Sequence, residues 1–435
     1  MKCLLVIIDG LADRPSPILG NRTPLQSAFT PNLDKLSSLG ANGLMDPISP
    51  GLAPGSETAH YLIFGYQLAD FPGRGVLEAI GEGVEFDDED VVLITSFASV
   101  LPQGDRLKLL ARYMPQEAED CGRLAPAVPK AEIDGISFTP IYLRKGGGLL
   151  ILKGDVSPDV TDADPFTLDL PVIKVQPMRD SPEFKKAWHT AEALNKYMAL
   201  VHEVIKDHPV NGERKRRGAI PINFLLTKWA SKKRPVEPFH ERFGMRGAVI
   251  ANPPFYHGIA KVLGMTPLAL PSIEDPEEDL KARFALAEEL FFKKGYDFIH
   301  IHTKVADDAA HKKDPLLKKE VIERLDPAFA TLITGLAVRE DVLTIVTADH
   351  ATPSVGPLIH SGEAVPITFI GKNVLQDDVV EFNEKAAGRG SLGRFRSSEL
   401  MNMVLNYTDR MNRHELRPLN RRVFYVPKEV EPFKL

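Results

Sequence analysis

The sequence predicts an α/β fold, in which a mostly parallel sheet with helices on both faces is interrupted by an inserted α+β domain. Short apolar, β-branched runs alternate with helical segments near both ends of the chain, which is typical of such a sheet. Strand-like runs with only one long helix between them fill the middle. Because 435 residues are too many for one ordinary core, we expect a core domain of residues 1–77 and 255–435 and an inserted domain of residues 78–254.

The first element expected is a buried strand over Cys3–Ile8, a continuous apolar run that ends abruptly at Asp9. Such runs are typical of parallel sheets covered on both faces. Ligands bind outside the carboxyl ends of these strands, so Asp9 stands where chemistry is expected. Thr30 and Pro31 then predict the start of a helix, and Gly40 follows its end.

The later elements follow the same alternation in the C-terminal part of the chain. There we expect helices over Glu274–Lys294, Asp314–Ala337 and Ser397–Asn406, and strands over Asp297–His302, Val342–Val346 and Pro366–Ile370. In the middle we expect strands over Val91–Val100, Ile136–Leu143 and Leu149–Leu152 and one long helix over Ser181–Ile205. The basic run at residues 214–217 is interpreted as a solvated loop, with a rim that attracts phosphate as the less favoured alternative.

Composition excludes several classes of protein. A hydrophobic content of 43% with 26% charged residues indicates a folded globular chain. A net charge of −6 gives no reason to expect a nucleic-acid or membrane partner. The apolar run at the start is too short for a signal peptide or a transmembrane helix. Two cysteines, Cys3 and Cys121, exclude a disulfide framework and a cysteine-rich zinc site. We therefore expect a soluble, cytoplasmic protein.

Acids, histidines and one hydroxyl gather at predicted strand ends and loops. They are Asp9, Ser56, Asp307, His311, Asp349, His350 and His360. Carboxylates and imidazoles at one sheet edge suit a site with two divalent cations, which bind a phosphoryl oxygen and lower the pKa of a serine hydroxyl. Ser56 follows a glycine in a turn before a helix expected over Thr58–Phe64, and taken alone it would be interpreted as a helix cap. The whole set favours a metal site.

Several motifs carry a family resemblance that covers nearly the whole chain. They include LLVIIDGLADRP at 4–15, TPLQSAFTPNLDKLSSLG at 23–40, PGSETAHYLIFGY at 54–66, GRGVLEAIGEGVEF at 73–86, HGIAKVLGM at 257–265, KVADDAAH at 304–311, TADHATPS at 347–354 and HSGEAVPI at 360–367. With these motifs the chain resembles the alkaline phosphatase superfamily. Within that superfamily it is most similar to the archaeal-type, cofactor-independent (2,3-bisphosphoglycerate-independent) phosphoglycerate mutases.

The resemblance implies an alkaline-phosphatase-like core with an inserted cap domain and two metal ions. One metal would be held by Asp9, Ser56, Asp349 and His350, and the other by Asp307, His311 and His360. Ser56 would take the phosphoryl group as a phosphoserine and return it to another hydroxyl of the glycerate. The expected activity is therefore that of a glycolytic isomerase that interconverts 2- and 3-phosphoglycerate. The oxygen and nitrogen donors suit Mn²⁺ or Zn²⁺, and Mg²⁺ less well.

The substrate side departs from the family pattern. Gly146–Gly148 stand where a Tyr-Arg-His run is usual, Lys228 where Arg is usual, and His257 where Lys is usual. Arginine holds a carboxylate or phosphate with two parallel hydrogen bonds, a geometry that lysine does not reproduce. The remaining candidates for anion contacts are Arg74, Arg144, Lys153, Lys228, Arg242 and His257. Asp162 is a candidate acid or base toward the substrate hydroxyl, with a turn and helix cap as the alternative.

Two other functions stay open from the sequence. The first is a divergent metal-dependent phosphohydrolase or mutase acting on another small phosphorylated or phosphonate acid. The second is a non-catalytic metal-binding relative whose cap domain binds a partner, which the complete set of metal-ligating residues disfavours. The sequence does not fix the metal, the substrate or the oligomeric state.

Overall fold

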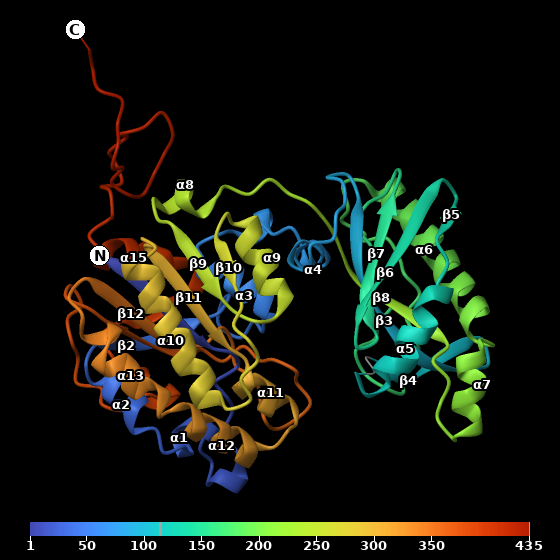
Figure 1. Ribbon diagram of the computed structural model, residues 1–435, viewed down its shortest axis with the longest axis horizontal. Helices are drawn as coiled ribbons and strands as arrows, with labels where there is room; N and C mark the ends of the chain where they lie inside the picture. The colour runs from blue at the N-terminus through green and yellow to red at the C-terminus, as the bar shows by residue number, and fades with distance from the viewer. Residues whose placement is uncertain (113–114, 435) are drawn as a thin grey trace. The chain divides into compact units, whose positions relative to one another are not determined.

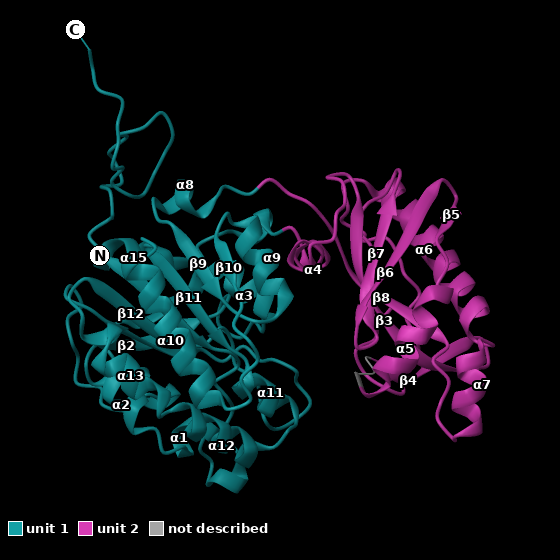
Figure 2. Cartoon of the chain, viewed as in Figure 1, with its two compact units in different colours: residues 1–71, 236–435 teal, residues 72–235 magenta. Residues whose placement is uncertain are grey.

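The computed structural model describes residues 1–112 and 115–434. The chain forms two compact units (Figure 2): unit 1 comprises Met1–Phe71 and Val236–Leu435, and unit 2 is Pro72–Pro235. The divisions therefore lie at residues 71/72 and 235/236, whereas the sequence suggested 77/78 and 254/255. Strand β9 (Gly247–Ile250) falls in the segment expected to be inserted, yet it pairs in parallel with β11 (Phe298–Thr303) of unit 1.

Unit 1 contains a sheet of eight strands with helices around it (Figure 1). In spatial order the strands are β10 (Thr266–Leu268), β9, β11, β1 (Lys2–Ile8), β12 (Val342–Thr347), β13 (Val365–Ile370), β2 (Ala41–Asp46) and β14 (Gly393–Arg396). Only β13 runs antiparallel to its neighbours. The predicted α/β class with a mostly parallel sheet is therefore confirmed.

The three central strands of unit 1 place the candidate site. Strand β1 pairs in parallel with both β11 and β12, with Ile8 opposite Thr303 and Ile7 opposite Thr347. Nearly every residue of these strands is buried, which explains their continuous apolar sequence. Because parallel strands end at one edge of a sheet, the residues that follow β1, β11 and β12 meet there.

The helices of unit 1 include some that were expected from the sequence and several short ones that were not. They are α1 (Pro24–Ser27), α2 (Pro31–Ser37), α3 (Ser56–Ile63), α8 (Phe239–Phe243), α9 (Pro254–Val262), α10 (Pro276–Phe292), α11 (Val305–His311), α12 (Pro315–Leu325), α13 (Ala328–Thr334), α14 (Glu384–Ala387) and α15 (Leu400–Tyr407). Of these, α2, α3, α10 and α15 correspond to helices expected from the sequence. The single helix expected over Asp314–Ala337 was wrong, because α12 ends at Leu325 and α13 begins after Pro327. Proline lacks an N–H group and clashes with the preceding turn, so it ends a helix there.

Unit 2 is the α+β domain that the sequence suggested. Its elements are α4 (Arg74–Glu82), β3 (Val91–Gln103), β4 (Arg106–Arg112), α5 (Ala118–Leu124), β5 (Ala131–Ile133), β6 (Ile136–Arg144), β7 (Gly147–Lys153), α6 (Phe184–Ile205), α7 (Pro209–Arg216) and β8 (Phe224–Lys232). The strands form one antiparallel sheet. Residues on one face of β3, such as Leu93 and Phe97, share an apolar core with α6, and Val92 on the other face packs against Ala79 of α4.

The basic run at residues 214–217 differs from its prediction. Arg214 belongs to α7 and is buried, with a relative exposure of 1%. Its guanidinium group forms ion pairs with Glu117 and Asp120. The run is therefore partly structural, because a buried arginine needs carboxylate partners to offset its lost hydration. No helix among the described residues has the length and apolar character needed to cross a membrane.

Candidate active site

The carboxyl ends of β1 and β12 bring Asp9, Asp349 and His350 together. All three side chains are fully buried, and one ligand atom of each lies within 4.8 Å of the others. His350 Nε2 is 3.4 Å from Asp9 Oδ1 and 3.2 Å from Asp349 Oδ2. Two carboxylates and an imidazole at this spacing are a donor set for a divalent cation.

A second group shares His350 and adds Asp307 and His360, again with ligand atoms within 4.8 Å of one another. Asp307 lies on α11, which directly follows β11. His311, one turn later on the same helix, places Nε2 3.1 Å from Asp307 Oδ2. The rings of His350 and His360 stack with their centroids 3.9 Å apart. The structure therefore brings the predicted acids and histidines to one place in unit 1.

Ser56 lies beside the first group. It is the first residue of α3, with Gly55 as the N-cap, so this helix begins two residues earlier than the sequence suggested. The Ser56 Oγ is 3.0 Å from His350 Nε2. The N–H groups at a helix N-terminus favour negative charge. The serine hydroxyl is thus held next to the acids and histidines, where an anionic oxygen would be stabilised.

Two unpaired oxygen atoms show that these residues fit a metal ion. Asp9 Oδ2 accepts hydrogen bonds from Tyr256 and His302, and Asp349 Oδ1 accepts from two backbone N–H groups. The other oxygens, Asp9 Oδ1 and Asp349 Oδ2, are buried and have no hydrogen-bond partner among residues 1–112 and 115–434. An unpaired buried carboxylate oxygen is costly. Both face His350 Nε2, so a cation there would satisfy all three atoms.

The electrostatics of the site are strongly perturbed. Burial raises the pKa of Asp349 far above its usual range, and the negative charge of Asp9 raises it further. Burial opposes ionisation of Asp9 as well, but the Lys304 ammonium and the His302 hydrogen bond hold its pKa well below the usual range. Burial lowers the pKa of His350 to about 3. His350 is therefore neutral at pH 7, the form that binds metals.

The sequence did not predict the residues that contact these candidate ligands. His302 and Tyr256 hold Asp9 Oδ2, each at 3.1 Å, and the Lys304 ammonium forms ion pairs with Asp9 and Asp307. The run DFIHIHT carried a signal, because two histidines at alternate positions of a buried strand share one face. Tyr256 had no comparable signal, since it meets Asp9 only through the fold.

In unit 2, the predicted Lys228 is part of a charged cluster. Its Nζ lies 3.3 Å from Asp164 Oδ2, and Arg112 Nη2, which the sequence analysis missed, lies 2.9 Å from the same oxygen. Asp162 Oδ1 accepts a hydrogen bond of 2.7 Å from the backbone N–H of Trp229, a bulky residue held at φ +55°. Burial raises the pKa of Asp162. The structure thus places Lys228 and Asp162 near one another in this unit.

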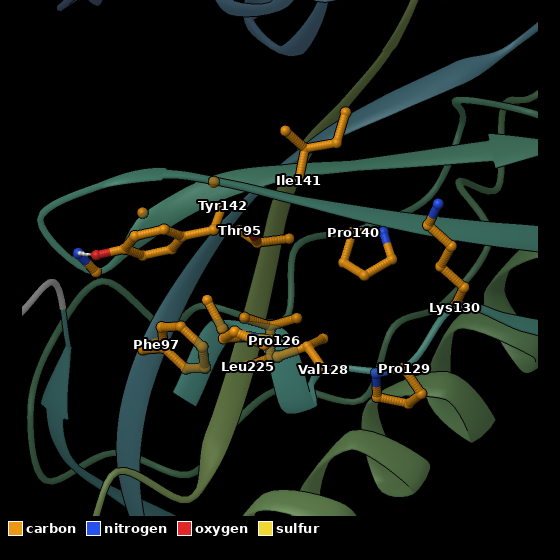
Figure 3. Close-up of a pocket in the computed structure, with 14 residues that line it drawn as sticks. Thr95, Phe97, Pro126, Val128, Pro129, Lys130, Pro140, Ile141, Tyr142 and Leu225 are labelled. Carbon is orange, nitrogen blue, oxygen red and sulfur yellow. Dashed lines mark hydrogen bonds between the residues drawn. The ribbon is translucent and has the colours of Figure 1, made fainter. Parts of the chain in front are cut away.

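The other substrate candidates have partners of their own. Arg144 Nη1 donates to Glu82 Oε2 at 2.9 Å, Arg242 lies 3.5 Å from Glu237, and His257 Nε2 is 2.7 Å from the Ala251 carbonyl oxygen. Gly146–Gly148 line a cavity of about 350 Å³ within unit 2, whose walls include apolar Phe97 and Leu225 and polar Thr95 and Lys130 (Figure 3). These glycines therefore line a cavity of mixed polarity to which they contribute no charged side chain.

Comparison with known proteins assigns the chain to a family. The model of the metalloenzyme superfamily matches residues 1–407. The 2,3-bisphosphoglycerate-independent phosphoglycerate mutase 2 of Methanocaldococcus jannaschii is 42% identical over 439 residues, 99% of each chain. The chain belongs to this metalloenzyme family. The enzyme of the same name from Methanopyrus kandleri is 39% identical over 420 residues, covering 95% of this chain and 97% of its own.

Two solved structures resemble the fold. A protein of Pyrococcus horikoshii gives a TM-score of 0.75 at 29% identity, covering 95% of this chain and 98% of its own. The cofactor-independent phosphoglycerate mutase of Thermoplasma acidophilum gives 0.62 at 31% identity, covering 94% of this chain and 100% of its own. The family resemblance seen in the motifs is therefore confirmed, and the chain is a member of a metal-dependent enzyme family.

Proposed function

We propose that this chain is a 2,3-bisphosphoglycerate-independent phosphoglycerate mutase, an isomerase that interconverts 2- and 3-phosphoglycerate through a phosphoserine at Ser56. One observation carries the proposal: the Ser56 hydroxyl lies 3.0 Å from His350 Nε2, beside the unpaired buried oxygens of Asp9 and Asp349. The relatives that bear this enzyme name cover almost the whole chain. As a glycolytic step, the reaction also favours a cytoplasmic location.

The metal-ligating residues divide into two sets. Asp9, Ser56, Asp349 and His350 would hold one ion, and Asp307, His311 and His360 the other. Two divalent ions supply positive charge that binds phosphoryl oxygens and lowers the pKa of a serine hydroxyl. Neutral imidazoles together with carboxylates favour Mn²⁺ or Zn²⁺ over Mg²⁺.

The chemistry of the residues then follows. Ser56 Oγ attacks the phosphorus atom, the bond from phosphorus to the glycerate oxygen breaks, and that oxygen takes a proton to become a hydroxyl. The second glycerate hydroxyl then attacks the phosphoserine and loses its proton, which regenerates Ser56. Asp162 is the proposed proton carrier, since its raised pKa makes it a better acid–base group than an exposed aspartate. Lys228, Arg144, Arg242 and His257 are the proposed contacts to the substrate anion.

A second candidate function is a phosphohydrolase. Lys228 replaces a usual arginine, its ammonium is already paired with Asp164, and Arg144 is paired with Glu82. A glycerate held by fewer bidentate hydrogen bonds would dissociate before it receives the phosphoryl group again. Water would then attack the phosphoserine and release free phosphate. A charged hydrogen bond contributes about 1.5–3 kcal/mol, so the loss of two would reduce transfer about a hundred- to ten-thousand-fold.

One assay distinguishes these functions. The metal-loaded enzyme is incubated with 3-phosphoglycerate, and 2-phosphoglycerate and free phosphate are both counted. We expect slow isomerisation with some phosphate release, abolished by a chelator and restored by Mn²⁺. Fast isomerisation without phosphate release would show that the substitutions near the substrate do not weaken transfer. Release of phosphate alone would favour the hydrolase. If neither product forms, the mutase proposal fails and the enzyme acts on a different substrate.

The Ser56→Ala variant tests the nucleophile. We expect it to fold and to lose turnover by several orders of magnitude, while the wild-type enzyme carries phosphate on Ser56 when it is trapped with substrate. The control is Ser27→Ala, which also removes a serine hydroxyl from unit 1. Unlike the Ser56 hydroxyl, that of Ser27 has no hydrogen-bond partner among the described residues. Substantial activity of Ser56→Ala would contradict the phosphoserine route.

A further inference from the structure

Thr352 lies directly behind the metal-ligating residues and has no part in the proposed chemistry. Its side chain is fully buried. The hydroxyl Oγ1 lies 2.7 Å from Asp307 Oδ1 and 3.1 Å from His350 Nδ1. One hydroxyl therefore joins an acid of the second metal group to the histidine that both groups share.

The hydrogen atoms in this arrangement can be assigned from donor counts. A hydroxyl has one hydrogen, and an ionised carboxylate can only accept. Asp307 faces the Lys304 ammonium and His311 Nε2 with its other oxygen, and a carboxylate that holds a cation accepts hydrogen bonds at both oxygens. Thr352 thus donates to Asp307, and His350 must donate Nδ1–H to Thr352. The lone pair of His350 is then on Nε2, which faces Ser56 and the unpaired oxygens of Asp9 and Asp349.

The backbone of Thr352 is itself held in place. Its N–H donates to the Ala12 carbonyl oxygen at 3.0 Å. The buried ammonium of Lys318, on α12, donates to the carbonyl oxygens of Thr352 at 2.9 Å and of Ala12 at 3.0 Å. These hydrogen bonds connect the segment that follows β1 to the segment that follows β12. They hold the Thr352 backbone at the position from which its hydroxyl reaches Asp307 and His350.

We propose that Thr352 is a positioning residue that fixes the Nε2 lone pair of His350 toward the metal and couples the two metal positions. The inference rests on the proposed metal-ligating residues. Partners behind metal ligands commonly change metal affinity 10–100-fold when they are removed. Thr352→Val keeps the shape of the side chain and removes the hydroxyl, so it should weaken Mn²⁺ binding by about 10–100-fold. Thr352→Ser keeps the hydroxyl and should restore most of the affinity.

The test is a titration of the metal-free protein with Mn²⁺, following free Mn²⁺ by electron paramagnetic resonance. The matched control is Thr344→Val, which removes a buried hydroxyl of β12 that has no hydrogen-bond partner among the described residues; it should bind Mn²⁺ as the wild type does. Wild-type affinity in Thr352→Val, or equal losses in Thr352→Val and Thr352→Ser, would overturn the inference. If the wild type binds no Mn²⁺, the proposed metal-dependent function fails instead.

A second measurement does not depend on whether Thr352→Val folds. In wild-type protein labelled with ¹⁵N-histidine, the His350 signal, assigned by its loss in His350→Gln, should show a proton on Nδ1 and none on Nε2. A proton on Nε2 in the metal-free protein at neutral pH would refute the role of Thr352, whatever the metal affinities are.

Discussion

Replacing Lys318 with methionine should be among the most damaging single changes in unit 1. Its ammonium is fully buried and lies 3.0 Å from Asp13 Oδ2. Methionine has a similar length but no charge, so Asp13 would stay buried without its cation. The carbonyl oxygens of Ala12 and Thr352 would also each lose the hydrogen bond from the ammonium. Removing one partner of a buried ion pair costs about 3–5 kcal/mol. We therefore expect the free energy of unfolding to fall by about that amount.

Urea unfolding followed by circular dichroism measures this loss. The control is Lys319→Met on the same helix, because Lys319 pairs with Glu323 near the surface at 2.6 Å and such a pair contributes only about 0.3–0.5 kcal/mol. Adding Asp13→Asn to Lys318→Met removes the unpaired charge, so the double variant should be less destabilised than the two single losses added together. A loss below about 1 kcal/mol for Lys318→Met, or additive losses in the double variant, would refute this reasoning.

Two further changes have clear expected outcomes. In Gly10→Ala, the new Cβ would lie 2.5 Å from Thr352 Oγ1 and 2.8 Å from Asp307 Oδ1 at φ +63°, so Mn²⁺ titration should show weaker binding; unchanged binding would contradict the close approach. For Asp297, burial opposes a lowered pKa, but the Arg246 N–H and the Arg410 guanidinium at 2.7 Å keep the pKa below its usual 3.8. Its contribution to stability is therefore complete above pH 3.8 and is lost as pH falls through the lowered pKa. Asp297→Asn should be less stable than wild type at neutral pH, with a difference that shrinks in acid; a difference that is the same at all pH values would contradict this cause.

Much of the fold was readable from the sequence because its central strands are buried on both faces. Strands β1, β11 and β12 appear in the sequence as short, continuous apolar runs. Such runs are too short for buried helices, so a buried strand is the interpretation that remains. Strand β9 did not stand out, because four residues give too short a pattern and only its pairing with β11 identifies it. The break between α12 and α13 was visible as Pro327, but the apolar spacing continued through it and concealed the break.

The candidate site was predictable to the extent that its residues follow strand ends. Asp9, Asp307 and Asp349 each come shortly after a buried strand, and parallel pairing alone brings such positions together. Thr352 and Lys318 could not be assigned in this way. Their importance lies in contacts between segments far apart in the sequence, and a buried lysine within an amphipathic helix looks the same in sequence as an exposed one.

The proposed substrate contacts differ from the family pattern at Lys228, where lysine replaces the usual arginine but keeps the positive charge. In unit 2, Arg112 and Lys228 both pair with the fully buried carboxylate of Asp164. Burial lowers the pKa of Lys228, Asp164 raises it, and the nearby Arg112 lowers it again. A bound anion would relieve this repulsion between cations, so the cluster keeps the capacity to attract a phosphate or carboxylate. What a lysine lacks is the rigid two-pronged geometry that fixes orientation. If Lys228 contacts the substrate as proposed, attraction without fixed orientation would slow the return of the phosphoryl group to a reoriented glycerate more than the first transfer to Ser56.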